Sequence, residues 1–228
     1  TYAPAAGQGY FEPLPASGPV DAPVIVTEVI DFKCGFCAAR HGFIKRLQAE
    51  FRDVRFVVKH LPFVDATQSE LGAIASMAAN RQGRFSEYAD MLFRHQKDSW
   101  TQQKLTEYAQ ELGLDVPRFL ADLGRPSLRS YVRMDKQASD EVEVHGTPTL
   151  FVNGRVLSDT GFMRQDPAAV RDLVRAAAAS VADRVAAGAD LETARAADAG
   201  AHHPSGERFA RLFVLNDVSD LRVDLRSR

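Results

Sequence analysis

The sequence predicts an α/β protein with a mixed central sheet and a helical domain inserted between the two halves of that sheet. Three observations support this prediction. A strand–helix–strand pattern occupies residues 24–58. Apolar residues then recur at helical spacing between residues 67 and 143. Strand signals return at residue 149, around an Asn-Gly pair. The chain has 228 residues, which is long enough to bury such a core without disulfide staples.

The first half of the predicted sheet begins after a proline-rich arm. Residues 1–20 contain many Pro, Gly and Ala residues, so we expect an extended segment there. Residues 24–30 are β-branched and almost wholly apolar, which is typical of a strand buried on both faces. A helix should run from the 31–37 segment to about Glu50, and residues 54–58 form the next strand. Two strands joined by such a helix should be parallel.

The remaining elements follow from spacing and turn residues. The block at residues 67–143 predicts about four helices. The Asn-Gly pair at residues 153–154 indicates a hairpin between two short strands. A helix should follow over residues 167–187, since proline suits a first helical turn. Residues 188–228 form a C-terminal extension. Its part at 188–208 is rich in Ala, Gly, Asp and His and predicts a loose segment, and its last twenty residues form a short hairpin or a docked tail.

The composition excludes several classes of protein. Apolar residues make up 45% and charged residues 25% of the chain, which is unlike collagen, a coiled coil or a wholly disordered chain. The 28 basic and 30 acidic residues leave a net charge of −2, so we expect no nucleic acid and no anionic membrane surface as a partner. No apolar run approaches the roughly 18 residues of a membrane helix. The chain begins at Thr1, so we expect that any secretory signal has already been removed.

Cys34 and Cys37 are the two cysteines of the chain, and they lie where a buried strand meets the start of a helix. The first turn of a helix carries unpaired N–H groups and a positive dipole end, which stabilise a thiolate. We therefore expect Cys34 to be exposed and nucleophilic, and Cys37 to be shielded and to resolve a mixed disulfide. Lys33 should favour the Cys34 thiolate further. The pair is predicted to work as a redox couple.

Structural or metal-binding thiols are the alternative interpretation of this pair. Two cysteines at this spacing make half of a zinc site, and His41 lies on a similar helix face as a conceivable third ligand. The sequence has no second cysteine pair, and His202 and His203 are adjacent rather than spaced as zinc ligands. We therefore expect no metal.

Pro148 is the second signal, because it directly precedes a predicted strand. An X-Pro bond at such a place can be cis. A cis bond would present the backbone of Thr147 beside the cysteines, ready to pair with an extended peptide. An ordinary trans proline at the start of a strand is the alternative.

Glu28 is the third signal, an acidic residue within an otherwise apolar strand and six residues before Cys34. Burial of a carboxylate is costly unless it is paired or protonated, so its pKa should be raised. A protonated carboxyl near the inner sulfur can accept or return the proton of Cys37. In the alternative interpretation, Glu28 lies on an edge strand and faces solvent.

These features together resemble the thioredoxin fold, and the inserted helices resemble its DsbA-like branch of thiol–disulfide oxidoreductases. The resemblance implies a thioredoxin-fold domain over residues 21–66 and 144–187, with an inserted helical domain over residues 67–143. The stretches that carry it include Asp21-Ala22-Pro23-Val24, Asp31-Phe32-Lys33-Cys34-Gly35-Phe36-Cys37, Phe85-Ser86-Glu87-Tyr88, Leu112-Gly113-Leu114-Asp115 and His145-Gly146-Thr147-Pro148-Thr149.

The resemblance also implies residue roles. Cys34 matches the nucleophile, Cys37 the resolving cysteine and Glu28 the buried acid. Phe36 stands where oxidases of this branch commonly have His, which removes one source of thiol acidity. The residues that match or flank the substrate-contacting positions are Gly35, Phe36, Thr147 and Pro148, and an apolar rim for unfolded clients is expected at Phe36, Leu61 and Phe63.

The activity implied by the resemblance is that of an extracytoplasmic, most simply periplasmic, oxidase. Such an enzyme passes its Cys34–Cys37 disulfide to reduced or misfolded client proteins through a mixed disulfide at Cys34. It needs no cofactor beyond that disulfide, and a membrane redox partner restores it. We expect a monomer, because the arm is too short for the extra N-terminal domain of isomerase relatives. A disulfide reductase or isomerase at the same site, or a non-catalytic peptide-binding adaptor, are the alternatives.

Overall fold

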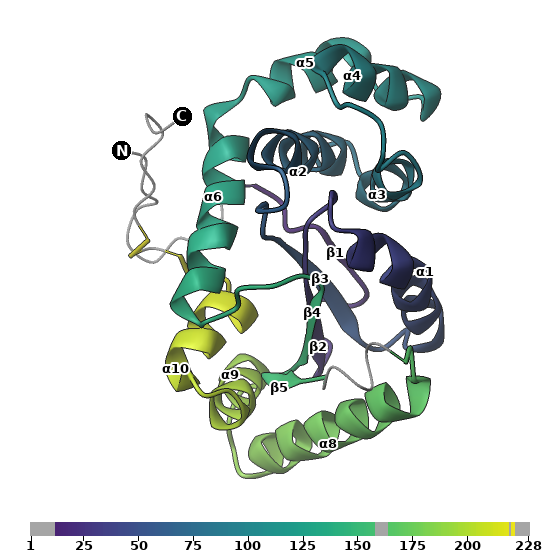
Figure 1. Ribbon diagram of the computed structural model, residues 1–228. Helices are drawn as coiled ribbons and strands as arrows, with labels where there is room; N and C mark the ends of the chain where they lie inside the picture. The colour runs from purple at the N-terminus through teal and green to yellow at the C-terminus, as the bar shows by residue number, and fades with distance from the viewer. Residues whose placement is uncertain (1–11, 158–163, 219, 222–228) are drawn as a thin grey trace.

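A five-stranded mixed sheet lies at the centre of the protein (Figure 1), as predicted. The computed structural model describes residues 12–157, 164–218, 220 and 221. The strand order is β1-β3-β2-β4-β5. The pairing is parallel between β2 and β3 and antiparallel elsewhere. The strands are β1 (Ala16–Ser17), β2 (Ile25–Ile30), β3 (Arg55–His60), β4 (Thr149–Val152) and β5 (Arg155–Val156).

The central position of β2 decides the environment of Glu28. β2 is buried along its whole length between β3 and β4, and Glu28 is directly opposite Val58 on β3 and Leu150 on β4. The edge-strand alternative for Glu28 is therefore wrong. The parallel crossover from β2 to β3 is made by α1 (Gly35–Glu50), as predicted.

The inserted helical domain contains five helices, one more than the spacing predicted. They are α2 (Ala66–Asn80), α3 (Phe85–Arg94), α4 (Gln102–Glu111), α5 (Val116–Leu123) and α6 (Pro126–Glu141). The additional boundary lies around α5. The Asp115 side chain caps the start of α5 by accepting from the N–H of Arg118, and Pro126 occupies the first turn of α6, a position that suits proline.

The two faces of the sheet are covered by different helices. α1 and α8 (Pro167–Ala186) pack on one face, around Phe43, Leu47 and Val174. The other face is covered by α6 and by the C-terminal extension, whose Phe209 and Phe213 pack against Phe151 of β4. The site described below lies where the sheet meets the helical domain (Figure 1).

The prediction of a loose segment at residues 188–208 is wrong. The segment forms α9 (Leu191–His202) and enters α10 (Gly206–Phe209), and the chain continues into a wide helical turn, η1 (Ala210–Val214). Of the two alternatives for the last twenty residues, the structure supports a docked tail as far as Leu221, which is buried. The alternating residues Val223 and Leu225 lie outside the described part of the chain.

Close contact with the β4–β5 hairpin explains why α9 forms despite its small side chains. Asp198 of α9 is fully buried and accepts hydrogen bonds from the Arg155 guanidinium at 2.6 and 2.8 Å. Asn153 donates a further bond to Asp198. The backbone of α9 also lies very close to Gly154, where an added Cβ would be 2.3 Å from the carbonyl oxygen of Ala199. The predicted Asn-Gly turn is thus covered by the extension.

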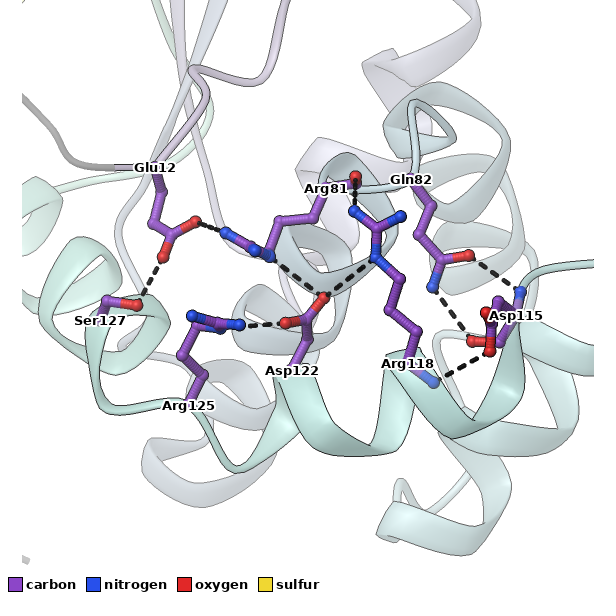
Figure 2. Close-up of polar contacts among 8 residues, drawn as sticks. All are labelled: Glu12, Arg81, Gln82, Asp115, Arg118, Asp122, Arg125 and Ser127. Carbon is purple, nitrogen blue, oxygen red and sulfur yellow. Dashed lines mark hydrogen bonds and ion pairs between the residues drawn. The ribbon is translucent and has the colours of Figure 1, made fainter.

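An ion-pair network ties the N-terminal arm to the helical domain (Figure 2). The nearly buried Glu12 carboxylate contacts Arg81 of the α2–α3 connection and accepts from the hydroxyl of Ser127 on α6. Asp122, also buried, lies within ion-pair distance of Arg81, at 3.1 Å, and of Arg125, at 3.0 Å. The arm is therefore held from residue 12 onward.

Within the described residues, no helix is both long and apolar enough to cross a bilayer.

Candidate active site

Cys34 and Cys37 lie at the start of α1, between the sheet and the helical domain. Cys34 is the N-cap residue of the helix, and Cys37 lies one turn further along. Both cysteines are free thiols in the structure and belong to the core cluster that joins the sheet to the inserted helices. The predicted placement at a helix N-terminus is therefore confirmed.

The environment of Cys34 favours the thiolate. A hydrogen bond from the Cys37 side chain lowers the pKa of Cys34 most, and the nearby Thr147 side chain and the backbone N–H groups of Cys37 and Phe36 lower it further. Together these outweigh the effect of burial and bring the pKa of Cys34 from its ordinary 9.0 to about 5. The thiolate therefore predominates at neutral pH.

The prediction that Cys34 is exposed is wrong, because only 6% of the residue is exposed to solvent. The reason is the loop before β4, which covers it. In its protonated form, the Cys34 thiol donates to the carbonyl oxygen of Thr147 at 3.2 Å. Cys37 is fully buried, as predicted. Burial raises the pKa of Cys37 well above its ordinary range, and the hydrogen bond to Cys34 adds to this effect. The two sulfurs thus differ strongly in acidity.

Thr147 and Pro148 lie beside the cysteines, as the sequence predicted, and the peptide bond between them is cis. Both residues are half-buried. The Thr149 hydroxyl donates to the carbonyl of Gly146, which holds the loop in a tight turn. The trans alternative is therefore excluded.

Glu28 lies within β2, and its side chain is buried. Burial raises the pKa of Glu28 from 4.5 to about 8, in agreement with the predicted direction. Glu28 lines a cavity of about 240 Å³ between the sheet and the helical domain, together with Ile30, His41 and Phe93. A cavity of this size and polarity accommodates several water molecules. Glu28 therefore borders a space large enough for water.

Lys33 does not play the predicted role. Its ammonium group donates to the carbonyl oxygens of Gln96, at 2.9 Å, and of Asp98, at 2.7 Å, and it lies 3.9 Å from the ring centroid of Trp100. It is directed toward the inserted domain, and it is not among the groups that shift the pKa of Cys34. Adjacency in sequence does not bring the Lys33 ammonium group to the Cys34 sulfur, because Lys33 lies in a turn in which successive side chains point in different directions.

Asp31 is a site residue that the sequence reasoning missed. Its buried carboxylate accepts four hydrogen bonds, from the backbone N–H groups of Lys33, Phe63 and Val64 and from the hydroxyl of Ser69. Asp31 thereby joins the cysteine loop to the β3–α2 connection and to α2. A polar residue directly after a buried strand was the available signal.

The surface around the cysteines is partly apolar. Phe36 and Phe63 are 60% and 48% exposed, as expected for an apolar rim, but Leu61 is buried and does not contribute. Val64, which the prediction did not include, is exposed instead. Gly35 is exposed and has open space where a side chain would be.

The zinc alternative finds no support in the arrangement of side chains. His41 contacts Asp90 of α3 through Nε2, at 2.6 Å, and Lys45 pairs with the same carboxylate. Across the part of the chain that the structure describes, no group of three or more His, Cys, Asp or Glu side chains is arranged to hold a metal ion.

Comparison with known families agrees with this geometry. A family model described as thioredoxin matches residues 13–174, which include both cysteines and Pro148. This chain belongs to the thioredoxin family. The C-terminal extension lies beyond the matched region.

Solved structures of DsbA-like proteins share the fold. BdbD from Bacillus subtilis superimposes with a TM-score of 0.64 at 24% identity, over 78% of this chain and 99% of BdbD. α-DsbA2 from Wolbachia pipientis gives 0.59 at 18% identity, over 67% and 84%. The catalytic domain of ScsC from Proteus mirabilis gives 0.58 at 17% identity, over 73% and 89%. The predicted thioredoxin fold with an inserted helical domain is thus confirmed.

Curated relatives carry a different name. The Na⁺/H⁺ antiporter NhaA of Herminiimonas arsenicoxydans is 41% identical over 141 residues, which cover 61% of this chain and 22% of the antiporter. NhaA 3 of Salinispora tropica is 39% identical over 139 residues, which cover 60% and 21%. The chain therefore spans about a fifth of the length of these relatives.

Proposed function

We propose that this protein is a thiol–disulfide oxidoreductase that donates a Cys34–Cys37 disulfide to reduced client proteins. The contrast in acidity between the two sulfurs is the observation that carries the proposal. Cys34 has a pKa of about 5, whereas the pKa of Cys37 is raised by burial. A stabilised Cys34 thiolate favours the reduced form, which makes the disulfide a good oxidant.

The reaction proceeds in two exchange steps. A client thiolate attacks Cys34 Sγ, the Cys34–Cys37 bond breaks, and Cys37 leaves as a thiolate that takes up a proton. A second client thiolate then attacks the client sulfur of the mixed disulfide and releases Cys34 as a thiolate. The client gains a disulfide, and its two electrons reside on the cysteine pair. The low pKa of Cys34 makes it a good leaving group in the second step.

Glu28 is the acid that we assign to the buried cysteine. Its pKa of about 8 keeps the carboxyl protonated near neutral pH, so it can give a proton to the leaving Cys37 thiolate and recover one through the adjoining cavity. We assign client contact to Thr147, Pro148, Gly35 and Phe36, because Thr147 contacts Cys34, Pro148 follows Thr147, and Gly35 and Phe36 are exposed in the first turn of α1 beside Cys34. The redox-active disulfide is the sole redox group in this scheme.

The proposed cellular setting follows from the resemblance to DsbA-like thiol–disulfide oxidoreductases. We place the protein outside the cytoplasm, in the periplasm or its equivalent, where it acts as a monomer on reduced or misfolded proteins and a membrane redox partner reoxidises it. A partner that instead keeps the pair reduced would turn the same site into a reductase or isomerase. The reduction potential of the pair separates the two directions.

The antiporter relatives favour a second candidate, in which the same dithiol serves a membrane cation transporter. The observation behind it is the 41% identity to NhaA of Herminiimonas arsenicoxydans. Transport measured in vesicles with the antiporter and this protein present tests it. A redox link is supported if adding the wild-type protein changes the transport rate and adding Cys34→Ser does not. Equal transport with both contradicts it.

A client oxidation assay tests the leading proposal. The oxidised protein should form the disulfide of a reduced dithiol peptide, Cys34→Ser should be inactive, and Cys37→Ser should accumulate mixed disulfides at Cys34. Absence of exchange by the oxidised wild type, with the pair shown to be intact, would overturn the proposal.

A further inference from the structure

The inserted domain holds the backbone of the reactive cysteine through a single side chain. Gln96, in the connection between α3 and α4, donates from its Nε2 amide to the carbonyl oxygens of Phe32 and Cys34, both at 2.8 Å. The two hydrogens of the amide are thereby both used. The two carbonyls flank Lys33, so the amide spans the middle of the cysteine loop.

Lys33 makes a reciprocal contact, from the cysteine loop to the α3–α4 connection. Its ammonium group donates to the backbone carbonyls of Gln96 and Asp98. A side chain of the cysteine loop thus holds the backbone of the α3–α4 connection, while a side chain of that connection holds the backbone of the loop. We call this reciprocal pair, Lys33 and Gln96, the loop clamp.

The α3–α4 connection is itself fixed to the helical domain, mainly through Trp100. The Trp100 residue is 3% exposed, its ring nitrogen donates to the carbonyl of His95 at 3.2 Å, and its backbone N–H donates to the Gln68 side chain of α2 at 2.8 Å. The ring also fills the space over Gly72, where an added Cβ would lie 2.6 Å from it. The clamp therefore acts from a rigid support rather than from a free loop.

We propose that Gln96 is a positioning residue for Cys34 and that Lys33 is its counterpart, so that the inserted helical domain sets the geometry of the reactive thiol. This inference rests on the proposed function for its biological meaning but not for its measurement. Gln96 touches the backbone of Cys34 and not its sulfur.

The physical link runs through backbone orientation. The Cys34 sulfur is stabilised by the N–H groups of Phe36 and Cys37, and the direction of those groups relative to the sulfur depends on the dihedral angles of Cys34. The Cys34 carbonyl also accepts the N–H of Ala38, the first such bond along α1. A fixed carbonyl at Cys34 therefore keeps the N-cap in the conformation that aims helix N–H groups at the sulfur.

The test is the pKa of Cys34 in the reduced protein, measured by thiolate absorbance in wild type and Gln96→Ala, with no client present. We expect the pKa to rise by about one unit, which is a tenfold lower ratio of thiolate to thiol. Gln103→Ala is the matched control, because Gln103 is exposed and donates to Glu107 of its own helix. Its Cys34 pKa should match the wild type.

Lys33→Met supplies the second arm of the test. It keeps an unbranched chain beside Trp100 but removes the donor, so its effect on the Cys34 pKa should not add to that of Gln96→Ala in the double variant. An unchanged Cys34 pKa in a folded Gln96→Ala protein would overturn the inference, as would additive effects. A shifted pKa in a protein that exchanges no disulfides would leave the clamp standing and refute the proposed function alone.

Discussion

The sulfur of Cys34 lies 3.2 Å from the carbonyl oxygen of Thr147, across 113 positions of sequence. Cys34, the proposed nucleophile, therefore lies directly beside the loop before β4. In the proposed function, an extended client chain that pairs with the backbone at Thr147 brings its own cysteine next to Cys34. The cover that this loop provides also explains why Cys34 is less exposed than a helix N-cap alone would suggest.

Removal of the Cys37 thiol should make Cys34 less acidic. The hydrogen bond from Cys37 is the largest cause of the low Cys34 pKa, so Cys37→Ala should raise that pKa by about one unit or more. Cys37→Ser is the matched control, since its hydroxyl is still a donor, and its Cys34 should stay closer to the wild type. Thiolate absorbance across a pH titration measures both. Equal pKa values in the two variants would contradict the assigned cause.

Glu28→Gln should change how folding stability depends on pH. The folded protein keeps the Glu28 proton up to about pH 8, whereas an exposed glutamate releases it near 4.5. The folded state therefore holds an extra proton between these values, and the wild type should lose stability relative to Glu28→Gln as pH rises through that window. The loss is at most about 5 kcal/mol.

Urea unfolding of both reduced proteins across this range provides the measurement. Cys34 titrates in both proteins, so the difference between their free energies of unfolding reports on Glu28 alone. The difference should be constant below pH 4.5 and again above pH 8. A difference that does not vary with pH would show that Glu28 is not held protonated by burial.

Gly154→Ala should destabilise the protein and loosen α9. The added Cβ would meet the Ala199 carbonyl oxygen at 2.3 Å, and the φ angle of +76° is itself unfavourable for alanine. We expect a loss of about 3 kcal/mol or more. Gly83→Ala is the control, because its φ is +71° but its Cβ would enter open space, which should cost about 1 kcal/mol. Similar losses in urea unfolding would argue against tight docking of α9.

Asp31→Asn should cost far more stability than Asp65→Asn. One oxygen of Asp31 accepts three of its four hydrogen bonds. The side-chain amide of asparagine has one acceptor oxygen, so the variant loses either those three bonds or the bond from the backbone N–H of Lys33. We expect a loss of about 2–4 kcal/mol. Asp65 caps the start of α2, a role that asparagine performs nearly as well. Thermal or urea unfolding compares the two, and equal losses would refute the joining role of Asp31.

Local patterns in the sequence were enough to locate the candidate site. Cys34, Cys37, Glu28 and Pro148 each lie in a short stretch whose pattern predicts its place in the fold. The structure has the cysteines at the start of α1, Pro148 directly before β4 and Glu28 within the central strand β2. The βαβ pairing and the hairpin followed from equally local signals.

The remaining features depend on contacts between distant segments. α9 has few large apolar residues, and it is held by Asp198 and Arg155, 43 positions apart. The α3–α4 connection has no pattern of its own, yet Gln96 reaches the cysteine loop 62 positions away. Lys33 was misassigned for the same reason, since its partners lie in that connection. Such contacts have no signature in a single sequence.

The reduction potential of the Cys34–Cys37 pair, measured at equilibrium with glutathione, tests the central claim most directly. Thioredoxin, with a thiol pKa of about 7, has a potential of about −270 mV, and DsbA, with about 3.5, has about −120 mV. A Cys34 pKa of about 5 predicts a value of about −180 mV by interpolation. A potential at or below about −270 mV would contradict a disulfide donor.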